Sequence, residues 1–229
     1  MKHPHRRRFL RSVAFILLIV LALWSLPEHV TLSPSENVPT NAQPDLPWNL
    51  TLVNQESGVP EGYSFTLVHV RDDVKVDRRI ARALRHMLGD AEAAGYEVHL
   101  NSGYRTNTEQ QQLFDDKVQA FRAGGYDDAT ARTLASQWVS LPGRSEHELG
   151  IAVDIGTATP ALYDWLAEES WRYGFIQRYP YKKTGLTGVS HEPWHYRYVG
   201  EKAASAMYAQ DLCLEEYVQG LSDQACCIV

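Results

Sequence analysis

The chain has 229 residues, of which 44% are hydrophobic and 22% are charged, a composition typical of a folded globular protein and not of a disordered one. When the five basic residues at the N-terminus are set aside, 17 lysines and arginines stand against 28 aspartates and glutamates, a net charge of −11. Because nucleic-acid binding needs a basic surface, this acidic balance excludes nucleic acid as the expected partner.

The first 27 residues are arranged as a targeting segment. Basic residues come first, and an almost uninterrupted apolar run follows over 13–26. This order is typical of a signal peptide or an uncleaved signal anchor. The run is shorter than the roughly 20 residues of a full span, but no clear cleavage site and no lipidation cysteine follow it. We therefore expect an N-terminal membrane helix, as an uncleaved anchor in preference to a cleaved signal peptide. The body of the chain then lies across the membrane, because positive residues stay inside.

Residues 28–60 are rich in Pro, Ser, Asn and Thr, and we expect them to form a flexible tether. A single folded domain is expected over 61–220, followed by a C-terminal tail over 221–229. The apolar patterns predict an α+β fold, a small and mainly antiparallel sheet with flanking helices. In chain order, we expect a strand over 63–70, a helix over 77–94, a strand over 96–100, helices over 108–122 and 128–139, a strand over 151–155, a helix over 160–173, strands over 175–179 and 194–199, and a mostly helical segment over 200–217.

The three cysteines, Cys213, Cys226 and Cys227, lie near the C-terminus and lack the spacing of a zinc finger. In an oxidising compartment, Cys226 and Cys227 are candidate disulfide partners of Cys213.

The segment from His191 to His195 matches H-E-x-x-H, the zinc motif of helical metalloproteases. That motif requires a helix, in which residues i and i+4 share one face. Pro193 lies inside it, and proline in a helix interior costs about 3 kcal/mol. The residues that follow are strand-like, and residues four apart in a strand are separated by roughly 13 Å. Zinc ligands lie about 2 Å from the ion, so in a strand these two histidines cannot share one metal.

A second segment offers partners for His195. His147 precedes a glycine turn, and Asp154 lies in an apolar strand, where an aspartate is costly to bury unless it is paired or metal-bound. Two histidines and one carboxylate suit catalytic zinc, with the fourth position left for water. From spacing alone, His147 could equally be a surface or core histidine, and Asp154 could be a cap.

Three motifs in order carry a resemblance. Ser145 to Asp154 matches S-x-H-x-x-G-x-A-x-D, Glu192 to His195 matches E-x-W-H, and Ser102-Gly103-Tyr104-Arg105 precedes both. Together they resemble the VanY-type D-alanyl-D-alanine carboxypeptidases, which belong to a wider group of zinc peptidases that includes the lysostaphin-type enzymes and the hedgehog signalling domain. The resemblance covers residues 60–200.

The resemblance implies one Zn²⁺ per chain, located on the sheet and bound by His147, Asp154 and His195. It implies that Glu192 is the general base that activates water. It also implies that Arg105 binds the substrate carboxylate or polarises the scissile carbonyl, since a planar guanidinium suits either task.

Ser145 and Gln110 are at positions that resemble substrate contacts of this family. We expect Trp194 to be a packing residue that orients His195. His191 is expected to lie in the outer shell of the metal or on the substrate side.

The implied reaction is the removal of the C-terminal D-alanine from peptidoglycan stem peptides. We expect a monomer, anchored in the membrane of a bacterial cell envelope with its catalytic domain in the periplasmic or extracellular space. An L,D-carboxypeptidase or a peptidoglycan endopeptidase of the same fold is the alternative. A non-catalytic wall-binding module is a further one, although a pure binder would not need Glu192.

Overall fold

The computed structural model describes residues 46–71 and 73–226, and the structural statements that follow concern these residues. No helix in this part of the chain has both the length and the apolar character needed to cross a membrane. The N-terminal anchor predicted over 1–27 lies outside the described residues and stays a prediction.

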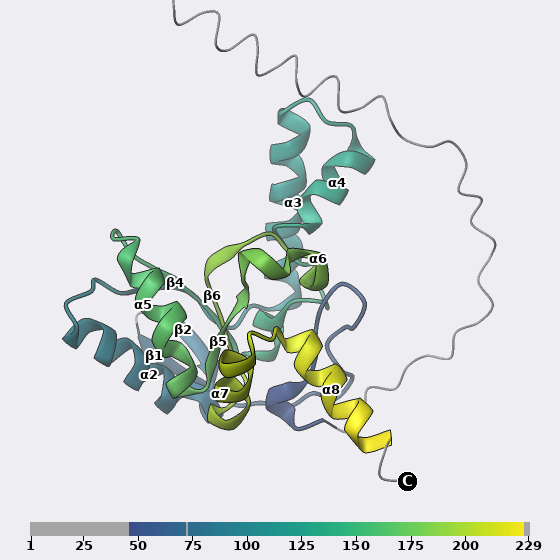
Figure 1. Ribbon diagram of the computed structural model, residues 1–229. Helices are drawn as coiled ribbons and strands as arrows, with labels where there is room; N and C mark the ends of the chain where they lie inside the picture. The colour runs from purple at the N-terminus through teal and green to yellow at the C-terminus, as the bar shows by residue number, and fades with distance from the viewer. Residues whose placement is uncertain (1–45, 72, 227–229) are drawn as a thin grey trace, which may run out of the picture. The chain divides into compact units, whose positions relative to one another are not determined.

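A four-stranded sheet lies at the centre of the domain, with strands in the order β3-β4-β6-β5 (Figure 1). All neighbouring strands are antiparallel, as predicted for an α+β fold. A separate two-stranded hairpin precedes it in the chain. The strands are β1 (Leu67–Arg71), β2 (Val74–Asp77), β3 (His99–Ser102), β4 (Ala152–Gly156), β5 (Phe175–Tyr179) and β6 (Glu192–Tyr198).

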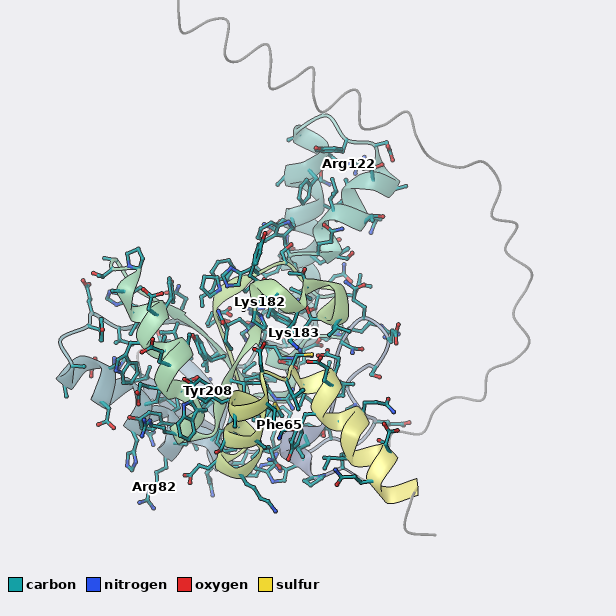
Figure 2. All side chains as sticks on the ribbon, in the orientation of Figure 1. Phe65, Arg82, Arg122, Lys182, Lys183 and Tyr208 are labelled. Atoms are coloured by element: carbon teal, nitrogen blue, oxygen red, sulfur yellow. The ribbon has the colours of Figure 1, made fainter. Side chains whose placement is uncertain are left out.

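Three of the described helices, α2, α3 and α4, begin at residues whose side chains cap them. The Asp77 side chain accepts from the backbone N–H of Arg79 at the start of α2, and Thr106 forms a capping box with Glu109 in α3. On the outer surface, Arg82 extends from α2 into solvent (Figure 2). The helices are α2 (Arg78–Ala93), α3 (Asn107–Ala123), α4 (Asp128–Ser136), α5 (Ala161–Glu169), α6 (Thr184–Thr187), α7 (Glu201–Gln210) and α8 (Leu214–Cys226), with 3₁₀ turns η1 (Trp48–Leu50), η2 (Glu146–Leu149), η3 (Ser170–Tyr173) and η4 (Tyr181–Lys183).

The two faces of the sheet differ in chemistry because side chains alternate along each strand. One face is apolar and packs against α2 and α5 in the main core, with sheet residues Val153, Ile155, Phe175 and Tyr196. The intervening residues point to the opposite face, and four of them are polar: Asp154, Arg178, His195 and Arg197. These four polar side chains therefore share one face of the sheet.

Several element predictions require correction. The strand expected over 63–70 begins only at Leu67, and its hairpin partner β2 was not predicted, because Val74–Asp77 runs directly into α2. The segment expected to be mostly helical over 200–217 is two helices, since Asp211 adopts a left-handed conformation with φ 53° and ends α7. The second of these, α8, continues to Cys226 and so enters the segment predicted as a tail.

The described part of the predicted tether, residues 46–60, packs on the domain. Val53 is fully buried in the main core and Leu50 is buried beneath the C-terminal helices. The guanidinium of Arg197 donates to the carbonyl oxygens of Asn49 and Thr51 at 3.2 and 2.9 Å. The expectation of a flexible tether is therefore wrong for this part of the segment, because a buried cation and an apolar pocket hold it.

Cys213 is buried and has no disulfide partner among the described side chains, and burial raises the pKa of its thiol to about 11. The side chain of Cys226 and the whole of Cys227 lie outside the described residues, so the predicted pairing stays a prediction.

Candidate functional site

The three predicted metal ligands meet on the polar face of the sheet. Antiparallel pairing of β4 with β6 places Asp154 directly opposite His195, which brings their Cβ atoms to within about 5.5 Å. Asp154 Oδ1 lies 3.1 Å from His195 Nδ1 and 3.4 Å from His147 Nε2. One ligand atom from each of these residues lies within 4.8 Å of the others, the only such cluster of three or more possible ligands among the residues that the structure describes.

His147 reaches this point from the short 3₁₀ turn η2. Gly150 ends that turn with φ 70°, a left-handed conformation that glycine adopts without strain. The Nδ1 atom of His147 lies 2.7 Å from the carbonyl oxygen of Gly103, to which it donates, so the lone pair of Nε2 faces Asp154. Gly103 lies so close to β2 that a Cβ atom at this position would collide with the carbonyl oxygen of Lys75. Only glycine therefore fits here without a shift of the backbone. The two motif glycines therefore set the position of this ring.

The electrostatics of the three ligands favour a cation. Burial works to raise the pKa of Asp154, but interactions with His147 and His195 outweigh it and hold that pKa well below its usual value. Burial lowers the pKa of His147, which keeps its imidazole neutral. Burial also works to lower the pKa of His195, but the carboxylates of Asp154 and Glu146 raise it to about 9. A metal ion that binds here therefore displaces a proton.

Glu192 lies beside the ligands at the start of β6. The β5–β6 pairing is irregular between Gln177 and Tyr179, and Pro193 lies in the part of β6 that this irregularity spans. Glu192 is 6% exposed, lines the cavity described below and has its Oε2 atom 3.7 Å from His195 Nδ1. Burial raises the pKa of Glu192 to about 7, with Asp154 adding to this effect and His195 and Arg105 opposing it. A carboxylate with such a pKa suits proton transfer near neutral pH.

The raised pKa of Glu192 predicts a stability cost. Its pKa is about 7 in the folded protein against an ordinary value of 4.5, so between these values the folded state binds more protons than the unfolded state. Stability from this group therefore falls as the pH rises through that window. We expect Glu192→Gln to raise the free energy of unfolding of the metal-free protein by about 1–3 kcal/mol at pH 8 and by almost nothing at pH 4.5. Denaturant unfolding of both proteins at both pH values measures this difference in stability. Equal free energies of unfolding for the wild type and the variant at pH 8 would contradict the prediction.

Arg105 is held against the metal ligands by three contacts. Its Nε donates to Ser102 Oγ at 2.8 Å, its Nη1 to Gln110 Oε1 at 3.1 Å, and its Nη2 to Asp154 Oδ2. A guanidinium has five N–H groups, so two of them have no hydrogen bond among the described residues. Arg105 lines the cavity, and these donors are suited to an anionic group there.

The two other predicted substrate contacts also line the cavity but have structural partners. Gln110 is almost fully buried, accepts from Arg105 and donates through Nε2 to the carbonyl oxygen of Ser140 at 2.7 Å. Ser145 caps η2, and its backbone N–H donates to Glu148 Oε2 at 3.2 Å. Both polar ends of the Gln110 amide are therefore engaged in holding Arg105 and the loop that follows α4.

The cavity beside the ligands has a volume of about 320 Å³. The predicted packing residue Trp194 is half-buried and lines it. Sequence reasoning did not identify Tyr179, whose ring centroid lies 4.9 Å from that of His195, or Trp138 and Lys117, which line the cavity from the α3–α4 side. Neither the two aromatic residues nor the lysine belongs to a sequence motif that would have indicated these positions.

His191 lies outside the ligand cluster, as predicted from Pro193 and the strand that follows. It is half-buried, and its Nε2 atom lies 3.3 Å from the side-chain nitrogen of Gln177. The text match to H-E-x-x-H is therefore not a metal motif in this structure.

Sequence reasoning also missed a buried charge network behind His195, formed by Glu146, Arg178, Arg197 and Glu215. Glu146 lies 2.7 Å from Arg178 Nε and 2.8 Å from Arg197 Nη1, and the Glu146 and both arginine side chains are completely buried. Arg178 also donates to both carboxylate oxygens of Glu215, at 2.9 and 2.6 Å. The available signal was an arginine in each of two predicted strands, Arg178 and Arg197.

Comparison with known proteins points to one family. The family model for VanY, D-alanyl-D-alanine carboxypeptidase, matches residues 73–201. A D-alanyl-D-alanine carboxypeptidase of Enterococcus faecalis (strain ATCC 700802 / V583) is 44% identical over 194 residues, which cover 81% of this chain and 72% of the relative.

Two solved structures are similar throughout most of the domain. VanYB in complex with D-alanine-D-alanine is 46% identical with a TM-score of 0.74, covering 76% of this chain and 98% of that one. A mutant of the vancomycin resistance D,D-pentapeptidase VanY from a VanB-type resistance cassette, in complex with Zn(II), is 46% identical with a TM-score of 0.73. That match covers 75% of this chain and 99% of the other.

Proposed function

This chain belongs to the VanY family of D-alanyl-D-alanine carboxypeptidases, and we propose that it removes the C-terminal D-alanine from peptidoglycan stem peptides. The observation that carries the proposal is the convergence of His147, Asp154 and His195 beside a buried glutamate with a raised pKa.

The ligand set fits zinc. Two imidazole nitrogens and one carboxylate oxygen are the ligands of many catalytic zinc sites, which leave a position open. His147 Nε2 and His195 Nδ1 both face the same oxygen of Asp154. Arg105 pairs with only one oxygen of Asp154, so the other oxygen, which both histidines face, is available to a metal ion. These three residues would therefore hold one zinc ion per chain.

When bound, zinc polarises the scissile carbonyl and makes water more acidic. Glu192 takes a proton from the attacking water and passes it to the leaving amine of D-alanine as the peptide bond breaks. The two free donors of Arg105 bind the substrate's terminal carboxylate, while Ser102 and Gln110 keep the guanidinium in place. This contact makes the enzyme an exopeptidase, because an internal peptide bond offers no carboxylate at that position.

The product profile on defined peptides tests this function. We expect a pentapeptide that ends in D-Ala-D-Ala to lose one alanine, and the same pentapeptide with a C-terminal amide to be cleaved much more slowly, since Arg105 then faces no anion. Mass spectrometry of the products measures both. Release of a dipeptide, cleavage of a cross-linked dimer, or a preference for tetrapeptides would instead indicate the alternative endopeptidase or L,D-carboxypeptidase activities.

We also propose that the domain acts outside the cytoplasm as a monomer anchored in the membrane of a bacterial cell envelope. The basic residues before the apolar run at 13–26 and the presence of the substrate in the cell wall support this. Protease accessibility in intact protoplasts and light scattering of the purified domain test the location and the oligomeric state. Protection from external protease would contradict the location outside the cytoplasm, and a dimeric mass would contradict the monomeric state.

A further inference from the structure

Glu146 faces the rear of the His195 ring. Its Oε2 atom lies 3.6 Å from His195 Nε2, slightly beyond hydrogen-bond length, and both atoms are buried without a hydrogen-bond partner among the described residues. Burying these two polar atoms without a hydrogen bond costs free energy, because each has lost its contact with water. A small rotation of either side chain would join them.

The opposite nitrogen of the same ring faces the metal position. His195 Nδ1 lies 3.1 Å from Asp154 Oδ1, so this nitrogen has to present its lone pair when a metal binds. A neutral imidazole then carries its proton on Nε2, where Glu146 is the carboxylate that can accept it. Carboxylates in this arrangement fix the tautomer and orientation of metal-binding histidines.

Glu146 is itself held by a chain of charges that ends on α8. Its Oε1 atom contacts both Arg178 and Arg197, and Arg178 is paired with Glu215 through two parallel hydrogen bonds. Two carboxylates and two guanidiniums balance in charge. If Glu215 were neutral, Arg178 would be an uncompensated buried cation and would draw Glu146 away from His195.

We propose that Glu146 is a positioning residue for the metal ligand His195, and that Glu215 on the C-terminal helix maintains it through Arg178. The inference rests on the proposed zinc site. It extends the metal site to a helix beyond residues 73–201, the part of the chain that the family model matches.

The test measures the metal site directly in the full-length protein. Zinc affinity is determined by competition with a chromophoric chelator, and ligand geometry by the visible spectrum of the cobalt(II)-substituted protein. We expect Glu146→Gln to weaken zinc binding about 10–100-fold and to alter the cobalt spectrum. Glu215→Gln should change both in the same direction by a smaller factor, and Glu215→Asp, which keeps the charge, should recover most of the loss.

Two control variants on the same helix separate positioning from general destabilisation. Glu216→Gln removes a carboxylate that pairs with Lys183 at 2.8 Å, on the outer side of α8. Val218→Ala removes apolar contacts of α8 in the core. Both should leave the zinc affinity and the cobalt spectrum unchanged, even where the melting temperature falls.

The outcomes distinguish this inference from the proposed function. If the wild-type protein binds no zinc, the proposed function fails. If the wild-type protein binds zinc but Glu215→Gln retains its affinity and spectrum, or if Val218→Ala reproduces the same changes, the positioning role is wrong. Because Glu215 is partly exposed, this variant is informative even if Glu146→Gln does not fold.

Discussion

Replacing Glu192 with alanine is expected to lower kcat by about 10²–10⁴-fold while zinc stays bound at close to one equivalent. Glu192 lies 3.7 Å from His195 and lines the cavity, but it does not belong to the ligand cluster. Its loss therefore removes the proton acceptor and leaves the three ligand atoms in place. Steady-state hydrolysis of a pentapeptide together with metal analysis measures the two effects separately.

Glu192→Gln is the matched control, because it preserves the size of the side chain and removes only its basicity. Its activity should fall nearly as far as that of the alanine variant. If either variant retains wild-type turnover, Glu192 is not the general base. If both lose zinc, its role is to hold the metal.

Removing any of the three ligands is expected to reduce the zinc content from about one equivalent to almost none. His147→Ala, Asp154→Asn and His195→Ala each leave two ligands, and the remaining buried groups cannot compensate. His191→Ala is the matched control, since His191 is four residues from His195 but outside the cluster. Atomic emission of the dialysed proteins measures the bound metal.

His191→Ala should retain its zinc, and its activity should be close to wild type unless its ring contacts substrate. A loss of zinc in this variant would show that His191 and His195 share the metal. That result would also contradict the strand assignment of β6, because residues four apart in a strand cannot both reach one ion.

The residues of the candidate metal cluster could be singled out from sequence because their motifs are local. The S-x-H-x-x-G-x-A-x-D segment contains the turn that directs His147 and the strand that carries Asp154. Pro193 was enough to reject a helical motif around His195. Strand β5 was predicted with its observed bounds, because Gly174 and Pro180 delimit the segment clearly.

The parts that were missed depend on contacts between distant residues. Residues 46–60 have the composition of a linker, and only the carbonyl groups that meet Arg197 and the pocket around Val53 make them part of the domain. Glu146 and Glu215 are 69 positions apart in the sequence, so nothing local indicates that Arg178 joins them. The hairpin strand β2 was hidden because its residues lead into α2 without a turn.

The position of the catalytic groups has a consequence for redesign. Backbone pairing between β4 and β6 fixes Asp154 opposite His195, whereas α3 and the loop after α4 supply much of the cavity wall. The helices α3 and α4 lie side by side (Figure 1) and share a small apolar core of their own, which includes Phe114 and Ala131. We therefore expect that exchange of the α3–α4 hairpin between relatives, with Gln110 retained because it holds Arg105, alters the choice of peptide while the sheet keeps Asp154 and His195 in place.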